Sequence, residues 1–251
     1  MTNDADNGGR GLEGASTGNG PSLRAVPFLK LAGSGSGPIE LLSDTQRQQL
    51  LQRASVRVLT ARTFVYRAGS PADSVFIIGD GVVKSFRDLP SGRRRIVAFL
   101  FAHDLFGLAE AGRYVNTVQT ITPTRIFQLD IDALTELFRL DSELELQFLC
   151  KTVHVLREAQ HHNIIVGRRD AVGRIAMLLR LLEKQSPRTR GHSDVLIPMT
   201  RSDMANYLGL SLEAVVRASR RLDRQGIVDF LSRHHARIVD RQRFAALASN
   251  V

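Results

Sequence analysis

Short runs in which apolar and polar residues alternate fill the chain between about residues 56 and 130. They are VRVLTARTFVYRAG, SVFIIGDGVVKSFRD, RRRIVAFLFAHDLFGL and VNTVQTITPTRIFQLD, with GSPAD, LPSG and EAGR between them. A period of two is typical of strands with one buried face, and Gly- or Pro-rich spacers are typical of turns. Several short strands at this spacing predict an all-β roll or barrel.

Helical periodicity appears on both sides of these runs. SDTQRQQLLQRA, over 43–54, predicts a short helix, and a second short helix then leads into a long one from about Ser142 to Gly167. A heptad seam, apolar in its first half, follows this long helix at Leu146, Leu149, Val153, Leu156, Gln160, Asn163 and Gly167. Such a seam predicts a homodimer interface. The alternative is that this face packs on the chain's own β domain.

The C-terminal part predicts helices followed by a hairpin. DAVGRIAMLLRLLEKQ predicts a helix and DVLIPM a strand. TRSDMANYLGLSLEAVVRASRRLDRQGIV, from Thr200 to Val228, predicts two helices that meet at Gly209, a residue suited to a left-handed helix end. GIVDFLSRHHARIVD then predicts two strands around a turn, and a short helix follows Asp240. Together these elements form a winged helix-turn-helix.

The caps and buried positions of this helix pair follow from side-chain chemistry. Thr200 and Asp203 fit a capping box, and Ser211 fits the cap of the second helix. The inward positions are predicted to be Met204, Ala205, Leu208, Val215, Ala218 and Leu222. The outward positions of the second helix are Glu213, Arg217, Arg220, Arg221 and Arg224.

A basic second helix of this kind is suited to DNA. The second helix of such a unit enters the major groove with its N-terminal residues at base edges. Arg217 can bond guanine O6 and N7, and Glu213 can accept from cytosine N4. Phosphate contacts are expected from Thr200, Arg201, Ser211, Arg220, Arg221 and Arg224. The alternative is an amphipathic helix with a solvated basic face.

The charge distribution supports a polyanionic partner for the C-terminal part. From Arg168 onward there are 16 Lys and Arg against 8 Asp and Glu, whereas the preceding 167 residues have 18 against 17. The Gly-, Asn- and Ser-rich first 37 residues predict a disordered tail. The chain shows no secretory signal and no apolar run long enough to span a membrane, so we expect a cytoplasmic protein with no membrane partner.

In their order along the chain, these elements resemble the Crp–Fnr family of bacterial transcription regulators over residues 43–247. Glu213 and Arg217 match the family's base-contacting Glu and Arg, and HDLFGLAEAG resembles the GDIFGL segment of the Fnr- and FixK-like branches, with His103 in place of Gly. The resemblance implies an α+β fold with a cyclic-nucleotide-binding-like β roll over 38–140, a dimerisation helix over 141–168 and a winged helix-turn-helix over 169–251. It also implies a homodimer that binds double-stranded DNA at a palindrome with TTG-type half-sites, and RNA polymerase as a partner if the protein activates transcription.

Three departures from the family pattern affect the expected function. Val216 stands where Fnr-like members have a Ser, so Val216 is expected to touch a thymine methyl rather than hydrogen-bond a base. Leu108 and the pair Asn116-Thr117 stand where cyclic-AMP-binding members have their Glu and their Arg-Ser or Arg-Thr pair, which argues against control by cyclic AMP. The N-terminal part has no cysteine, which excludes the iron–sulfur mechanism of Fnr itself.

Few residues remain as candidates for sensing a signal. Cys150 is the single cysteine, so an internal disulfide is excluded. Cys150 is a possible redox switch beside the seam, although an apolar-flanked Cys is more often a small buried residue. His154 and His161 share one helix face and are conceivable haem or metal ligands, but no further ligand cluster accompanies them. We therefore expect no metal and no cofactor.

The alternative class is a ligand- or haem-binding β domain, or an enzyme, whose basic tail binds nucleic acid non-specifically or docks on membranes. An enzyme needs a catalytic constellation, and the sequence has no phosphate-binding Gly-rich loop, no zinc-type His spacing and no nucleophile elbow. We expect no catalytic residues. A regulator that binds DNA without any effector is a further possibility.

Overall fold

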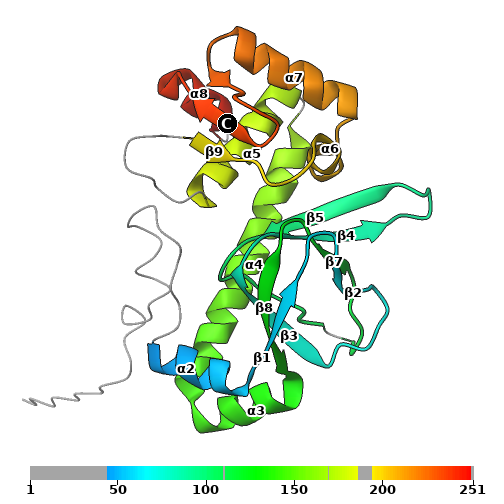
Figure 1. Ribbon diagram of the computed structural model, residues 1–251, viewed down its shortest axis with the longest axis vertical. Coiled ribbons are helices and arrows are strands. Elements are labelled where there is room, and N and C mark those ends of the chain that lie inside the picture. Colours follow the sequence, from blue (N-terminus) through cyan, green and yellow to red (C-terminus); the bar gives the residue numbers. More distant parts are fainter. Residues whose placement is uncertain (1–43, 110, 169, 186–193, 250–251) are drawn as a thin grey trace, which may run out of the picture. The chain divides into compact units, whose positions relative to one another are not determined.

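The computed structural model describes residues 44–109, 111–168, 170–185 and 194–249 (Figure 1). The tail predicted over 1–37 lies outside these residues. The predicted roll is present as two four-stranded antiparallel sheets, of order β1-β8-β3-β6 and β2-β7-β4-β5, preceded by α2 (Asp44–Arg53). The strands are β1 (Ser55–Leu59), β2 (Phe64–Tyr66), β3 (Ser74–Asp80), β4 (Val83–Asp88), β5 (Arg94–Leu100), β6 (Leu105–Phe106), β7 (Thr117–Thr120) and β8 (Thr124–Asp130).

Alternating apolar residues hold the two sheets of the roll together. Ile78 of β3 lies opposite Ile126 of β8, and both side chains are fully buried. The chain turns from β3 to β4 at Gly81, where φ is 94° and an added Cβ would lie 2.5 Å from the carbonyl oxygen of Pro123. Only a residue without a Cβ fits this turn without strain.

Aromatic side chains occupy part of the core of the roll. The rings of Tyr66 and Tyr114 stack with their centroids 3.7 Å apart, and Phe76 and Phe106 pack beside them. The Tyr114 hydroxyl donates a hydrogen bond of 2.8 Å to the carbonyl oxygen of Ser74, which satisfies this buried polar group.

His103 lies in the turn between β5 and β6 with φ at 71°, in the left-handed region. This is the position where the related sequence segment has Gly. The His103 N–H donates to the carbonyl oxygen of Ile78 at 2.7 Å, and this bond helps to hold the turn. Histidine is among the residues that enter this region more often than most.

Two helices follow the roll: α3 (Ile131–Leu140) and the long α4 (Ser142–Gly167). The predicted bounds of the long helix are confirmed. Helix α4 begins at Asp141, whose carboxylate accepts a hydrogen bond from the Leu144 N–H at 3.0 Å. Leu144 and Phe148 pack with α3 and the roll in one apolar cluster, which fixes the first turns of α4.

The winged helix-turn-helix that we predicted is also present. Its sheet has the order β10-β11-β9, with all pairs antiparallel. The elements are α5 (Ala171–Gln185), β9 (Asp194–Leu196), α6 (Arg201–Leu208), α7 (Leu212–Arg224), β10 (Val228–Asp229), β11 (His235–Ile238) and α8 (Arg241–Ala248). Its core is continuous and includes the fully buried Ile175, Met204, Val215 and Leu222.

Helix α6 contacts β4 through a largely buried ion pair. Lys84 Nζ lies 2.7 Å from Asp203 Oδ1, and the two side chains are 14% and 12% exposed. Beside this pair, the rings of Phe99 and Tyr207 lie 4.8 Å apart. These contacts hold the helix that precedes α7.

Substituting Lys84 is expected to destabilise the protein because it leaves the Asp203 carboxylate buried without its cation. We expect Lys84→Met to lower the free energy of unfolding by about 3 kcal/mol. The exposed pair of Arg125 and Asp80 provides the control, since Arg125→Gln should cost less than about 1 kcal/mol. Urea unfolding of the two variants measures the difference, and equal losses would contradict a stabilising role for the buried pair.

His162 of α4 packs on the same helix. Its ring stacks on Tyr207 at 4.0 Å, and its Nε2 donates to the Tyr207 carbonyl oxygen at 2.8 Å. Burial lowers the pKa of His162, the hydrogen bond to Tyr207 opposes this, and the nearby Arg95 and His161 lower the pKa further. The net result is a pKa below the ordinary value, which favours the neutral ring in the folded protein.

Protonation of His162 is expected to weaken the fold at mildly acidic pH. Because the folded pKa lies below the unfolded value of about 6.5, the unfolded chain takes up the proton first as pH falls. The stabilisation is therefore present above that value and is lost below it. Urea unfolding from pH 7.5 to 5.5 should show a larger loss for the wild type than for His162→Gln, which keeps an N–H donor but does not titrate. Parallel losses would contradict this assignment.

Candidate nucleic-acid interface

The first helix of the pair, α6, begins with the predicted capping box. The Asp203 N–H donates to Thr200 Oγ1 at 3.0 Å, and the Thr200 N–H donates back to the Asp203 carboxylate at 3.3 Å. The Thr200 hydroxyl hydrogen is also used, since it points to Asp203 Oδ2 at 2.8 Å. These bonds fix the start of α6.

The turn between α6 and α7 is held from both sides. Gly209 ends α6 with φ at 64°, as the sequence predicted. Arg174 of α5 donates from Nη1 to the Leu208 carbonyl oxygen at 2.8 Å, which satisfies an unpaired carbonyl at the helix end. The sequence alone did not identify Arg174, because its partner lies 34 residues away.

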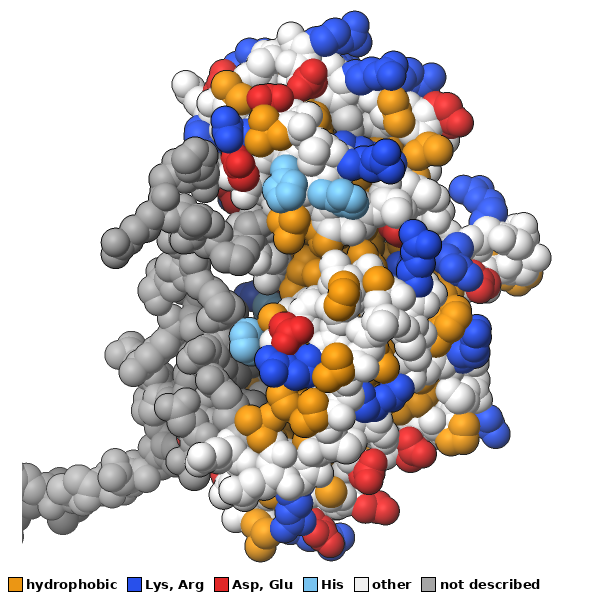
Figure 2. Space-filling model, in the orientation of Figure 1, with side chains coloured by type: hydrophobic (Ala, Val, Ile, Leu, Met, Phe, Trp, Pro, Cys, Tyr) orange, Lys and Arg blue, Asp and Glu red, His pale blue; other side chains and the backbone are white. Residues whose placement is uncertain are grey.

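Helix α7 presents one polar and charged face and one buried face. Ser211 caps the helix, with its Oγ accepting from the Ala214 N–H at 3.1 Å. The inward residues Val215, Ala218 and Leu222 are buried, as predicted. The exposed residues include Glu213, Arg217, Arg220, Arg221 and Arg224. In Figure 2, Lys and Arg side chains gather along the upper edge, where Figure 1 places α7.

The two candidate base-contacting residues lie four positions apart on this face. The backbone N–H of Glu213 and the Ser211 hydroxyl lower the pKa of the Glu213 carboxyl, and Arg217 adds a smaller effect. Glu213 therefore stays anionic and can accept hydrogen bonds, while the Arg217 guanidinium can donate two in parallel. Val216 is half-buried on the neighbouring edge of the helix.

Two candidate phosphate-contacting residues already have partners within the protein. The Thr200 hydroxyl is engaged in the capping box. The Arg201 guanidinium lies 4.9 Å over the ring of Phe230 and contacts the sulfur of Met204 at 3.2 Å. Phosphate contacts by these two residues stay predictions, since each would have to share or exchange these contacts.

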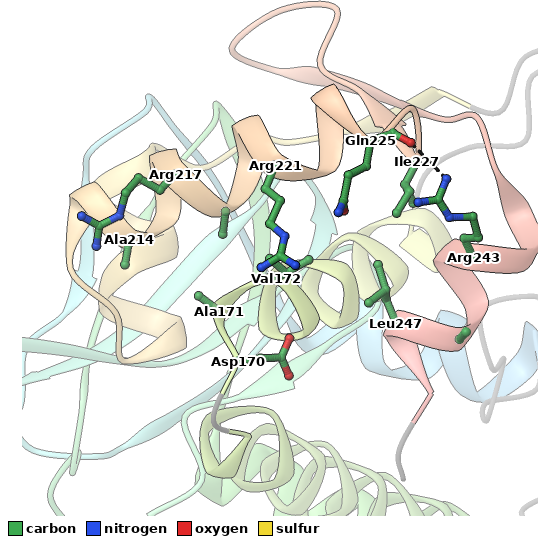
Figure 3. Close-up of a pocket in the computed structure, with 12 residues that line it drawn as sticks. Asp170, Ala171, Val172, Ala214, Arg217, Arg221, Gln225, Ile227, Arg243 and Leu247 are labelled. Atoms are coloured by element: carbon green, nitrogen blue, oxygen red, sulfur yellow. Dashed lines mark hydrogen bonds between the residues drawn. The ribbon is translucent and has the colours of Figure 1, made fainter.

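A cleft of about 670 Å³ lies beside α7 (Figure 3). Its walls come from α7, from the start of α5 and from α8. Arg217 and Arg221 line it together with Arg243 of α8, which the sequence did not single out. Figure 3 shows the Arg221 side chain pointing from α7 toward Val172 at the start of α5.

The predicted seam on α4 is exposed in this chain. Leu146, Leu149, Val153 and Leu156 are 44%, 60%, 43% and 58% exposed, so these side chains do not pack on the roll. Gln160 is also exposed. An exposed row of large apolar residues on one helix is suited to a second helix of the same kind.

The candidate sensing residues on α4 are not gathered into a site. Cys150 is buried, at 8% exposure. His154 Nδ1 lies 2.9 Å from Arg157, and burial followed by the nearby Lys151 lowers the pKa of His154. Among the described residues, no three His, Cys, Asp or Glu side chains lie close enough together to hold a metal ion. Within the same residues, no helix is long and apolar enough to cross a membrane.

Comparisons with known proteins agree with this architecture. Residues 56–141 match the cyclic nucleotide-binding domain family, and residues 173–247 match the Crp-like helix-turn-helix domain family. The chain is 30% identical over 186 residues to the nitrogen fixation regulation protein FixK of Bradyrhizobium diazoefficiens, covering 70% of this chain and 74% of the relative. The FixK protein of Azorhizobium caulinodans is 29% identical over 180 residues, covering 71% and 73%.

A solved structure extends the match to the fold. FixK2 from Bradyrhizobium japonicum superposes with a TM-score of 0.73 at 29% identity, covering 79% of this chain and 98% of that one. These relatives are transcription regulators rather than enzymes. The chain therefore belongs to the Crp–Fnr family of bacterial DNA-binding transcription regulators and is homologous to its FixK- and Fnr-type members.

Proposed function

We propose that this regulator acts as a homodimer in the bacterial cytoplasm and binds a palindrome with TTG-type half-sites. One observation carries the proposal: a capped helix, α7, exposes Glu213 and Arg217 together on one face, with Arg220 and Arg224 continuing that face. Glu213 and Arg217 contact base edges in the major groove, and Val216 contacts a thymine methyl. Ser211, Thr200 and the further arginines Arg201, Arg220, Arg221 and Arg224 contact phosphates.

The exposed apolar seam of α4 supports the homodimer. Pairing of two α4 helices through Leu146, Leu149, Val153, Leu156 and Gln160 buries these side chains. Dimerisation also supplies two recognition helices for the two halves of a palindrome, about 34–36 Å apart along the DNA. RNA polymerase is a further partner if the protein activates transcription.

Cyclic AMP is not the proposed effector. Leu108 is exposed and carries no carboxylate, where the cyclic-AMP-binding members have a Glu. Asn116 and Thr117 supply no cation for a phosphate, and the Thr117 hydroxyl already accepts from the Ala68 N–H at 3.0 Å. The Cys150 thiol remains a proposed redox switch, although its burial favours a packing role.

Fluorescence anisotropy on the full chain tests the proposal. A TTGAT-N4-ATCAA duplex and a scrambled duplex are titrated at about 150 mM salt, with and without cyclic AMP. We expect binding of the palindrome to be at least about 1000-fold tighter than that of the scrambled duplex, and unchanged by cyclic AMP. Equal, salt-sensitive binding to both duplexes would reduce α7 to a basic surface and refute base readout.

A further inference from the structure

We propose that the cleft between α7, the start of α5 and α8 holds the DNA backbone through Arg221 and Arg243, and we call it the α7–α5 cleft. The proposal rests on the function proposed above and deepens it. Arg243 lies outside the helix-turn-helix unit, so the C-terminal helix α8 takes part in DNA binding. The ligand is the phosphodiester backbone that flanks the bases contacted by Glu213 and Arg217.

The position of the α7–α5 cleft follows from the geometry of α7. Arg217 and Arg221 lie four residues apart and so are neighbours on the helix surface. Both line the cleft, which therefore adjoins the face with the base-contacting residues. A duplex that places its base edges against that face carries its backbone along the flank of the helix, where Arg221 extends toward the start of α5 (Figure 3).

The charges in the α7–α5 cleft suit a phosphate. No side-chain hydrogen bond or ion pair of Arg221 occurs among the described residues, and its side chain is exposed. Arg243 donates one hydrogen bond to the Gln225 carbonyl oxygen at 3.1 Å and lies 3.9 Å from Asp240. A guanidinium has five N–H donors, so Arg243 keeps donors for a ligand.

The one carboxylate in the cleft wall is already engaged. Asp170 accepts from the backbone N–H of Gly173 and from Arg168 Nε, so its charge is balanced within the protein. The rest of the wall is mostly apolar: Ala171, Val172, Ala214, Ala218, Ile227 and Leu247. Low-polarity surroundings strengthen the attraction between arginine and phosphate.

Salt dependence separates a phosphate contact from a base contact. The logarithm of the binding constant falls with the logarithm of salt by about 0.9 for each phosphate neutralised. Full-length Arg221→Gln, Arg243→Gln and the double variant are titrated with the palindrome and the scrambled duplex from about 50 to 300 mM salt. The wild type, Arg221→Lys and Arg243→Lys retain the charge. Lys184→Gln removes one exposed charge from the far end of α5 as the matched control.

We expect each Gln variant to bind both duplexes about three- to tenfold more weakly at about 150 mM salt, with the preference for the palindrome retained. The double variant should lose about 0.9 from the salt slope for each lost phosphate contact in each half-site. The Lys variants should retain the wild-type slope, and Lys184→Gln should match the wild type. Thermal unfolding midpoints separate loss of binding from loosening of α8.

Three results would overturn the proposal. They are wild-type slopes and affinities in both Gln variants, an equal loss in Lys184→Gln, or a loss confined to the palindrome. Failure of the proposed function gives a different result, namely a wild type without preference for the palindrome. The salt slopes on the scrambled duplex still test the α7–α5 cleft in that case.

Discussion

Arg217→Gln is expected to remove most of the preference for the palindrome while leaving the protein folded and able to bind DNA non-specifically. A bidentate contact between Arg and guanine contributes about 1–3 kcal/mol of base discrimination, and a homodimer makes it twice. The ratio of the two dissociation constants should therefore fall by at least about 30-fold. Arg217 is exposed and has no buried packing role, so the fold should be unchanged.

The control for Arg217→Gln is Arg139→Gln. Arg139 is an exposed arginine in the last turn of α3, and its substitution removes the same charge far along the chain from α7. Anisotropy titrations of both variants on both duplexes give the two ratios. An unchanged ratio in Arg217→Gln would show that this side chain does not contact a base. A proportional loss on both duplexes would reassign it to a phosphate.

Introducing carboxylates into the α4 seam is expected to separate the homodimer into monomers and to abolish tight DNA binding. Leu149 and Leu156 lie on the exposed seam, at 60% and 58% exposure. A charged group buried in an apolar interface is strongly unfavourable, so the Leu149→Glu/Leu156→Glu variant should not pair. Loss of bivalent attachment should weaken palindrome binding by at least about 100-fold.

Light scattering on eluting fractions measures the masses. The wild type should give twice the chain mass of 27.8 kDa, and the double variant should give the chain mass itself. Leu140→Glu is the matched control, because Leu140 is 78% exposed at the end of α3 and lies off the seam. A dimeric double variant would exclude the seam as the interface, and a monomeric wild type would contradict the homodimer.

Local rules made much of the fold predictable. The strands of the roll, the long helix and the winged helix-turn-helix follow from periodicity and turn residues, and the structure confirms them. The capping box of Thr200 and Asp203, the left-handed Gly209 and the exposed face of α7 were predictable for the same reason. Each depends on residues within a few positions of one another.

Contacts between distant residues were not predictable from the sequence. Lys84 and Asp203 form an ion pair across 119 positions, and His162 bonds the Tyr207 carbonyl across 45. Arg243 becomes a candidate only because the fold brings α8 beside α7. The base and phosphate contacts themselves stay predictions, since they depend on the bound duplex.

The most direct test of a homodimer with two base-contacting helices is to move its half-sites out of phase. Insertion of about five base pairs at the centre of the palindrome places the half-sites on opposite faces of the duplex. Wild-type affinity at about 150 mM salt should then fall to near that of the scrambled duplex. Affinity that survives the insertion unchanged would contradict simultaneous recognition of the two half-sites by a rigid homodimer.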